Sequence, residues 1–204
     1  MSVASQLLHQ ETDCVINSPL LSSLMSDYAE QDYFEILDLM PASGQFIDLF
    51  SAHHCKLYLP GCHAALSALN LDALDSENKL NSAFINSLGF KQQNKAALNL
   101  ILLWDLPNYL EARLLQALVQ YLLPHCAAKV MLHTYIHTRE QMPVTPANYK
   151  LQNDRRVAVE QTNTQTCLSP MYYQESLQKA MSPFLVQRGI LLSGGMQEYL
   201  MRLG

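Results

Sequence analysis

Short apolar runs alternate along the chain with longer stretches in which apolar residues recur at helical spacing. The clearest run is 99–104, where consecutive apolar residues end at Asp105, as expected of a strand buried on both faces. The stretch 109–123 has a broad apolar face, which predicts a helix packed against a sheet. The same reasoning predicts further strands at 34–39, 56–59, 129–136 and 149–160, and helices at 44–52, from about 64, at 77–88 and at 174–181.

The two ends of the chain have different patterns. Residues 1–32 have helical spacing with breaks, and Pro19 stands where a helix could start. The stretch 184–203 predicts an antiparallel hairpin that turns at Ser193-Gly194-Gly195. Strands that alternate with helices predict an α/β fold, here a doubly wound, mostly parallel sheet with a C-terminal antiparallel β-hairpin. We therefore expect an N-terminal helical segment, 1–32, followed by a single α/β domain, 33–204.

Composition narrows the class of protein. The chain has 204 residues, of which 49% are hydrophobic and 15% charged, so it has enough apolar side chains for a sizeable core. A net charge of −5 and the lack of a basic tract argue against nucleic acid as a partner, but leave a protein partner open. The N-terminus does not resemble a secretory signal, and no apolar run could span a bilayer. We expect a cytoplasmic protein, with its five scattered cysteines as free or buried thiols.

Ligands of doubly wound sheets bind beyond the carboxyl ends of the strands, where the strand order reverses. In this sequence that edge carries three segments: Asp38 to Gly44, Pro60-Gly61, and Asp105 to Tyr109. The segment 34–44 reads as the first strand and the turn that follows it. We expect a candidate site at this edge.

Four segments resemble class I S-adenosylmethionine-dependent methyltransferases, and in particular a bacterial subgroup without a named activity. Residues 37–44, Leu-Asp-Leu-Met-Pro-Ala-Ser-Gly, are similar to the first-strand signature of that family, an acidic residue followed by Gly-x-Gly-x-Gly. Residues 102–110 resemble its fourth strand, 129–138 its fifth, and 184–200 a terminal hairpin. The resemblance implies a Rossmann-like fold with S-adenosylmethionine as cofactor. It places the cofactor-binding positions at Asp38, Met40, Ala42, Ser43, Gly44 and Asp105.

The sequence departs from this family at the positions that would hold the cofactor. Met40 and Ala42 occupy the first two glycine positions, where a side chain obstructs the approach of the backbone to the cofactor. Pro41 also removes a backbone N–H. The strand 56–59 runs into Pro60-Gly61 without the acid that would bind the ribose, a loss of about 100-fold or more in affinity. These departures predict an eroded, vestigial cofactor site.

Two carboxylates at this edge each have two interpretations. Asp38 either orders the cofactor or caps the turn by accepting backbone N–H groups, and the missing glycines favour the turn. Asp105 either faces a substrate or caps a helix that begins near Pro107, and capping is favoured because proline suits the first helical turn.

The histidines and cysteines do not predict a catalytic or a metal site. His53-His54-Cys55 and Cys62-His63 lie on either side of a strand, which would hold them roughly 13 Å apart or more. His133 and His137 would lie on one side of a strand, but no acid or nucleophile at a suitable spacing accompanies them. We therefore predict no catalytic residue and no metal ligand.

Two functional hypotheses follow. In the first, a methyltransferase-fold protein without a cofactor is a pseudoenzyme that acts by binding an unidentified protein. In the second, the chain is an active S-adenosylmethionine-dependent methyltransferase with an atypical cofactor-binding loop. The first is favoured by the lost glycines and the missing ribose acid. The apolar tail and the leucine-rich helix also allow a homodimer.

Overall fold

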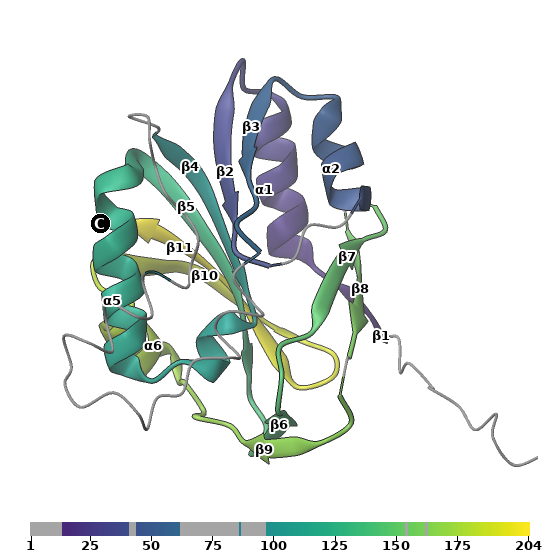
Figure 1. The fold of residues 1–204 in the computed structure, drawn as a ribbon, viewed down its shortest axis with the longest axis vertical. Helices are drawn as coiled ribbons and strands as arrows, with labels where there is room; N and C mark the ends of the chain where they lie inside the picture. The colour runs from purple at the N-terminus through teal and green to yellow at the C-terminus, as the bar shows by residue number, and fades with distance from the viewer. Residues whose placement is uncertain (1–13, 41–43, 62–85, 87–96, 154, 162) are drawn as a thin grey trace, which may run out of the picture.

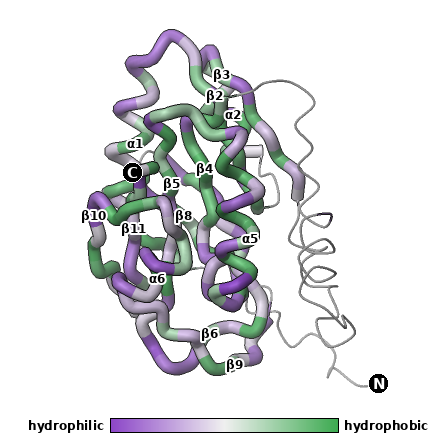
Figure 2. Tube along the Cα trace, turned by 90° about the vertical axis from the view of Figure 1, so that its left-hand side faces the viewer, coloured by the Kyte–Doolittle hydropathy of each residue, from purple (hydrophilic) through white to green (hydrophobic). Residues whose placement is uncertain are grey.

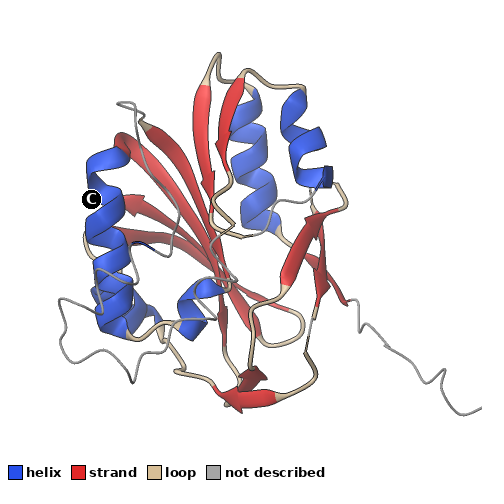
Figure 3. Ribbon diagram, in the orientation of Figure 1, coloured by secondary structure: helices blue, strands red, loops and turns tan. Residues whose placement is uncertain are grey.

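A central six-stranded sheet has helices on both of its faces (Figures 1 and 3). This computed structural model describes residues 14–40, 44–61, 86, 97–153, 155–161 and 163–204. The predicted helices from about 64 and at 77–88 lie outside these ranges, apart from residue 86. In the order β10-β11-β5-β4-β2-β3, the strands are β10 (Phe184–Leu192), β11 (Met196–Leu203), β5 (Cys126–His137), β4 (Leu98–Trp104), β2 (Phe34–Asp38) and β3 (Cys55–Tyr58).

The sheet is mixed rather than mostly parallel. Strands β3, β2, β4 and β5 are parallel to one another, whereas β11 pairs antiparallel with both β5 and β10. The predicted terminal hairpin is present, and it turns at Gly194 and Gly195, whose φ angles of +98° and +84° suit glycine. The expected α/β class and the hairpin are thus correct, and the sheet contains one strand of opposite direction near its β10 edge.

Each face of the sheet buries its own apolar cluster. Helices α1 (Pro19–Ala29) and α2 (Gly44–Ser51) cover the face that carries Leu100 and Leu102. Helices α5 (Ala112–Leu122) and α6 (Gln174–Ala180) cover the face that carries Ile101 and Leu103. Strand β4 is therefore buried on both faces, as its sequence predicts, and Figure 2 shows its hydrophobic course through the molecule. None of the helices in the described ranges has the length and hydrophobicity to cross a bilayer.

Two predicted segments differ from the structure. Within 1–32, described from residue 14, a strand β1 (Cys14–Asn17) precedes α1, so this part is not helical throughout. The predicted strand 149–160 is a hairpin of β7 (Asn148–Leu151) and β8 (Arg156–Glu160). Asn153 causes the break, because its side-chain oxygen accepts hydrogen bonds from the N–H groups of Arg155 and Arg156.

The added strands form two small sheets outside the central one. Strands β1, β8 and β7 form an antiparallel sheet in that order, and it lies beside α2 in Figure 1. A second, two-stranded sheet pairs β6 (Gln141–Pro143) with β9 (Thr166–Leu168). Both lie in the chain between β5 and α6, except for β1. The connection from β5 to α6 therefore contains four short strands, β6 to β9.

A buried carboxylate on the last strand holds the start of the first described helix. Glu198 of β11 accepts hydrogen bonds from the N–H groups of Leu20 and Leu21, at 3.2 and 2.9 Å, and from the hydroxyl of Ser18 at 2.6 Å. Its Oε1 also lies 2.8 Å from Nε2 of His133 on β5, and neither side chain is exposed. A carboxylate is favourable here because helix N-termini carry partial positive charge and unpaired N–H groups.

The environment of Glu198 favours its charged form. Burial by itself would raise the pKa of Glu198, but His133, Ser18 and the Leu21 N–H outweigh it, so the pKa lies below its ordinary value. A group with a lowered folded pKa contributes stability above its unfolded pKa, and loses that contribution as the pH falls through the folded pKa.

We expect Glu198→Gln to lower the free energy of unfolding by about 3 kcal/mol at pH 7, because it removes the charge from a buried, hydrogen-bonded pair. Urea denaturation measures this loss, which should shrink as the pH falls below about 4. Glu111→Gln is the matched control, since Glu111 forms an exposed ion pair with Arg113 and its loss should cost less than about 1 kcal/mol. Equal effects of the two substitutions would contradict this role of Glu198.

Candidate functional site

The carboxyl ends of β2 and β4 lie side by side, at the edge where the sequence predicts a site. Asp38, the last residue of β2, pairs with Leu102 of β4, and the N–H of Leu39 donates to the Leu102 carbonyl at 3.2 Å. Asp105 follows β4 directly. The structure thus brings two of the predicted site residues, Asp38 and Asp105, to one edge of the sheet.

Asp38 is buried and hydrogen-bonded within the protein. Its Oδ1 accepts from the backbone N–H of Met40 at 3.0 Å and from Nε1–H of Trp104 at 2.7 Å. Burial raises the pKa of Asp38 to about 7, although both hydrogen bonds act to lower it. The bond to Met40 is the turn-capping contact of the second interpretation, whereas a role toward a cofactor stays a prediction.

The other positions of the first turn are only partly described. Met40 is 2% exposed and belongs to the apolar cluster beneath α1 and α2. Gly44 begins α2, and a Cβ atom built there would contact nothing within 4 Å among the described atoms. Ala42 and Ser43, with Pro41, lie outside the described residues.

Trp104 occupies the centre of this edge. Its ring stacks on Tyr149 of β7, with centroids 5.0 Å apart and planes at 13°, and it meets the ring of Phe46 edge-on at 6.4 Å. Its φ of +52° is unusual for a bulky residue and costs about 1 kcal/mol or more. The stacking and the bond to Asp38 hold this conformation. From its sequence pattern Trp104 was predicted only as the end of a strand.

Asp105 contacts a loop instead of capping a helix. Its Oδ2 accepts from the N–H of Ala147 at 3.1 Å, and its side chain makes no cap bond to the short 3₁₀ helix η2 (Leu106–Tyr109) that follows it. A helix does begin near Pro107 with Asp105 at its N-cap position, but the favoured prediction of side-chain capping was wrong, because the carboxylate accepts from the loop before β7 instead. The side chains of Asp105 and Tyr149 also interact with each other, although neither Asp105 Oδ1 nor the Tyr149 hydroxyl has a hydrogen bond of ideal geometry among the described residues. Burial raises the pKa of Asp105 to about 7.

Asn108 fixes the geometry of the segment after β4. Its amide donates to the carbonyls of Asp105 and Tyr135, at 2.7 and 2.9 Å, and its oxygen accepts from the N–H of His137 at 2.8 Å. Both the NH₂ group and the oxygen of the Asn108 side chain therefore form hydrogen bonds within the protein, although the sequence made them candidates for binding a substrate. Tyr109 likewise donates to the Thr145 carbonyl at 2.9 Å.

At the end of β3 the structure has no acid. Its last residue, Tyr58, donates a hydrogen bond to Glu35 at 2.9 Å, and the chain continues through Leu59 and Pro60. Glu35 lies on β2, in parallel register with Lys56 of β3 rather than at the carboxyl end of the strands. A ribose-binding carboxylate of the kind the resemblance implies is therefore absent from this strand end.

The histidines form no catalytic pair or metal centre in the described residues. His133 is bound to Glu198, and Nε2 of His137 is buried without a hydrogen-bond partner there. No three His, Cys, Asp or Glu side chains converge on one point in these ranges. Cys62 and His63 of the metal interpretation lie outside them. His54 contacts the ring of Tyr33 at 5.0 Å.

No family model and no curated protein matches this sequence. By structure, the chain is similar to the PH0226 protein from Pyrococcus horikoshii OT3, with a TM-score of 0.51 and 10% identity over 91% of this chain and 89% of that one. It is also similar to the pyocyanin biosynthetic protein PhzM, with a TM-score of 0.50 and 11% identity over 91% of this chain. Because the match covers 55% of PhzM, this chain spans about half the length of that protein.

A SAM dependent methyltransferase from Aquifex aeolicus is a further similar structure, with a TM-score of 0.49 and 10% identity over 89% of this chain and 88% of that one. The similarities to the PH0226 protein and to PhzM support the expected α/β fold. At 10–11% identity they concern the fold alone. The chain has a fold similar to those of the PH0226 protein and PhzM.

Proposed function

We propose that this chain is a methyltransferase-fold protein that no longer uses S-adenosylmethionine and acts by binding another protein. The observation that carries the proposal is the bond between Trp104 and Asp38. The carboxylate that would order the cofactor accepts its hydrogen bonds from two side-by-side segments of the chain itself. Trp104, which supplies one of them, is 1% exposed.

A cofactor at this edge would have to compete with these internal contacts. Displacing Trp104 from Asp38 leaves a buried indole N–H without a partner, at a cost of about 1–3 kcal/mol, and leaves Asp38 with only its bond from the Met40 N–H. A carboxyl with a pKa of about 7 is also protonated in about half of the molecules at pH 7, which makes it a weaker acceptor for a ligand than a fully ionised carboxylate.

Aromatic packing adds to this cost. Trp104 stacks on Tyr149, and Tyr149 stacks in turn on Tyr135 with centroids 5.3 Å apart. Each such pair is worth about 0.5–1.5 kcal/mol beyond the apolar area it buries. The β1-β8-β7 sheet, which carries Tyr149, thus belongs to the same packed unit as the strand ends. Opening this edge would disturb the small sheet as well.

A protein-binding role is supported by the surface of β10, at the edge of the central sheet. Leu185 and Leu191 on this strand are 44% and 69% exposed. Exposed leucines on an edge strand favour association with another polypeptide. The partner class includes both a different protein and a second copy of this chain.

The alternative function is an active methyltransferase with an atypical loop. Gly44, with open space around its Cα, favours this alternative, because a ligand could approach the backbone there without meeting a side chain. Asp105 and Tyr149, whose side chains interact with each other but form no hydrogen bond of ideal geometry through Oδ1 and the hydroxyl among the described residues, also favour it as groups that a ligand could engage.

We expect titration with S-adenosylhomocysteine up to about 1 mM to give no calorimetric heat and no change in tryptophan fluorescence. Even a Kd of about 1 mM requires a favourable binding free energy of about 4 kcal/mol. Trp104 is the single tryptophan of the chain, so its emission reports on this edge alone. Micromolar binding accompanied by a change in Trp104 emission would overturn the proposal in favour of the active enzyme. Free adenosine serves as the ligand control.

We expect Asp38→Asn to flatten the fall in stability between about pH 4 and pH 7. Asp38 has an ordinary pKa of 3.8 and a folded pKa of about 7, so its burial stabilises the protonated form, and the folded state loses stability as the pH rises through this range. Asparagine keeps an oxygen that accepts both hydrogen bonds without carrying charge, so the variant should gain about 2–4 kcal/mol over the wild type at pH 8.

Urea denaturation at pH 4.5, 6 and 8 measures this difference. Asp48→Asn, on the exposed side of α2, is the matched control and should leave the pH profile unchanged. A variant of Asp38 that loses stability at pH 8, with the wild-type slope retained, would show that the carboxylate is needed in its charged form.

A further inference from the structure

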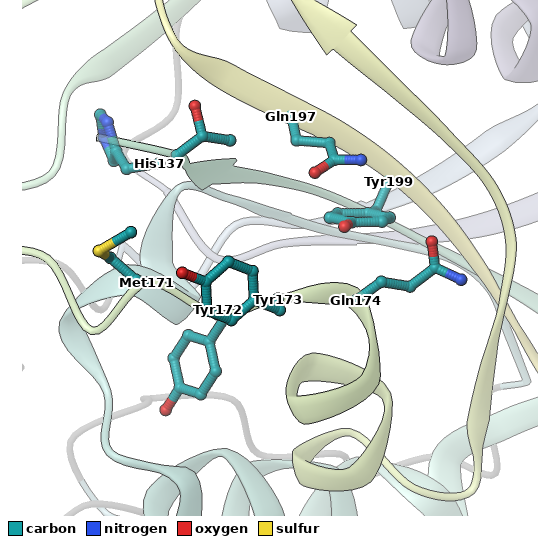
Figure 4. Close-up of a pocket in the computed structure, with 8 residues that line it drawn as sticks. His137, Met171, Tyr172, Tyr173, Gln174, Gln197 and Tyr199 are labelled. Carbon is teal, nitrogen blue, oxygen red and sulfur yellow. The ribbon is translucent and has the colours of Figure 1, made fainter. Parts of the chain in front are cut away.

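A cavity of about 160 Å³ lies at the carboxyl end of β5, formed by residues other than those of the Asp38–Trp104 edge. Its lining comes from segments far apart in the sequence: the end of β5, the segment that leads into α6, and β11 (Figure 4). The space corresponds to roughly five water molecules at about 30 Å³ each, which suits a single small ring. The lining residues are His137, Thr138, Met171, Tyr172, Tyr173, Gln174, Gln197 and Tyr199.

Two of the three tyrosines that line this cavity, Tyr172 and Tyr199, are held in place before any ligand binds, whereas Tyr173 is 70% exposed. The hydroxyl of Tyr172 donates to the carbonyl of Leu110 at 2.7 Å. Tyr199 is 1% exposed, and its ring packs across Gly189 of β10, where a Cβ atom would come within 2.9 Å of it. Glycine at this position therefore leaves room for the ring. Fixed aromatic walls favour the stacking of a planar group.

The backbone of the same segment is strained. Met171 has a φ of +49°, in the left-handed region that long side chains rarely adopt, and its N–H donates to the hydroxyl of Ser169 at 3.1 Å. Such strain costs about 1–3 kcal/mol and concentrates at ligand-binding segments. It sets the direction in which the chain passes from Met171 to the two tyrosines.

Two side-chain amides on the rim of the cavity are free to bind a ligand. Within the described part of the chain, neither Gln174 nor Gln197 makes a side-chain hydrogen bond, although an amide offers both a donor and an acceptor. Among the described residues that line the cavity there is no Lys, Arg, Asp or Glu. Burial lowers the pKa of His137, so this residue is uncharged near neutral pH. A charged ligand would therefore lose its hydration without gaining a counter-charge.

We propose that this cavity binds a neutral, planar heteroaromatic ring that carries an amide or lactam edge. The tyrosines stack on the ring, and the amides of Gln174 and Gln197 pair with the donor and acceptor of its edge. The site is separate from the Asp38–Trp104 edge, since none of its described lining residues is Asp38, Met40 or Trp104.

Nicotinamide and nicotinate make a matched pair of probes, because they share a ring and differ in a neutral amide against a carboxylate. In ¹H–¹⁵N spectra of the full chain, we expect nicotinamide to shift the amide signals of residues 137–138, 171–174 and 197–199, with a Kd of about 1 mM for so small a ligand. We expect nicotinate to bind at least about tenfold more weakly. Shifts at residues 38–40 and 104 instead would place the ligand at the Asp38–Trp104 edge and overturn this proposal. The proposed function is tested separately, by the titration with S-adenosylhomocysteine.

Gln197→Leu removes an amide while nearly preserving side-chain volume, and it should weaken nicotinamide binding about tenfold. Gln187→Leu, on the exposed part of β10 outside the cavity, is the matched control and should leave binding unchanged. If Gln197→Leu disturbs the fold, the exposed Gln174→Leu tests the same interaction. Equal binding of both probes, no localised shifts, or unchanged affinity in the glutamine variants would each overturn the proposal.

Discussion

The buried carboxylate of Glu198 joins β11, β5 and the start of α1. It accepts hydrogen bonds from the start of α1, from Ser18 and from His133, and it does so without exposure to solvent. Ser18 in turn lies 2.7 Å from the hydroxyl of Tyr135. The face of the sheet that carries the aromatic cluster is therefore positioned by one buried charge and its partners, since α1 covers this face.

Polar groups at the strand ends satisfy one another rather than remaining available. Asp38 accepts from Met40 and Trp104, and Asn108 bonds to three backbone groups. Such contacts rigidify a strand edge, and they raise the free energy needed to admit a ligand. The cavity beneath Gln197 has the opposite character, because its aromatic walls are fixed while its amides are unpaired. The Asp38–Trp104 edge thus has few polar groups left for a ligand, whereas the cavity has two side-chain amides that a ligand could bind.

Local patterns in the sequence predicted the elements whose signals are local. The buried strand 98–104 and the hairpin that turns at Gly194-Gly195 follow from consecutive apolar residues and from turn glycines. The break at Asn153 was missed, although an Asn-Asp pair inside an alternating stretch is a turn signal. Glu198 and His133 could not be paired from sequence, because 65 residues separate them and nothing in their neighbourhoods names the partner. The same holds for Trp104 and Asp38, 66 residues apart.

The bond from Leu20 to Glu198 spans 178 positions, which has a consequence for the order of folding. Helix α1 is synthesised early, yet the charge that holds its first turn emerges only with β11. Contacts of such long sequence separation form late, because closing the intervening loop costs entropy before the contact can repay it. An emerging chain therefore carries α1 without its partner while β2, β4 and β5 are already available. The first turn of this helix therefore lacks the carboxylate that accepts its N–H groups until synthesis has passed residue 198.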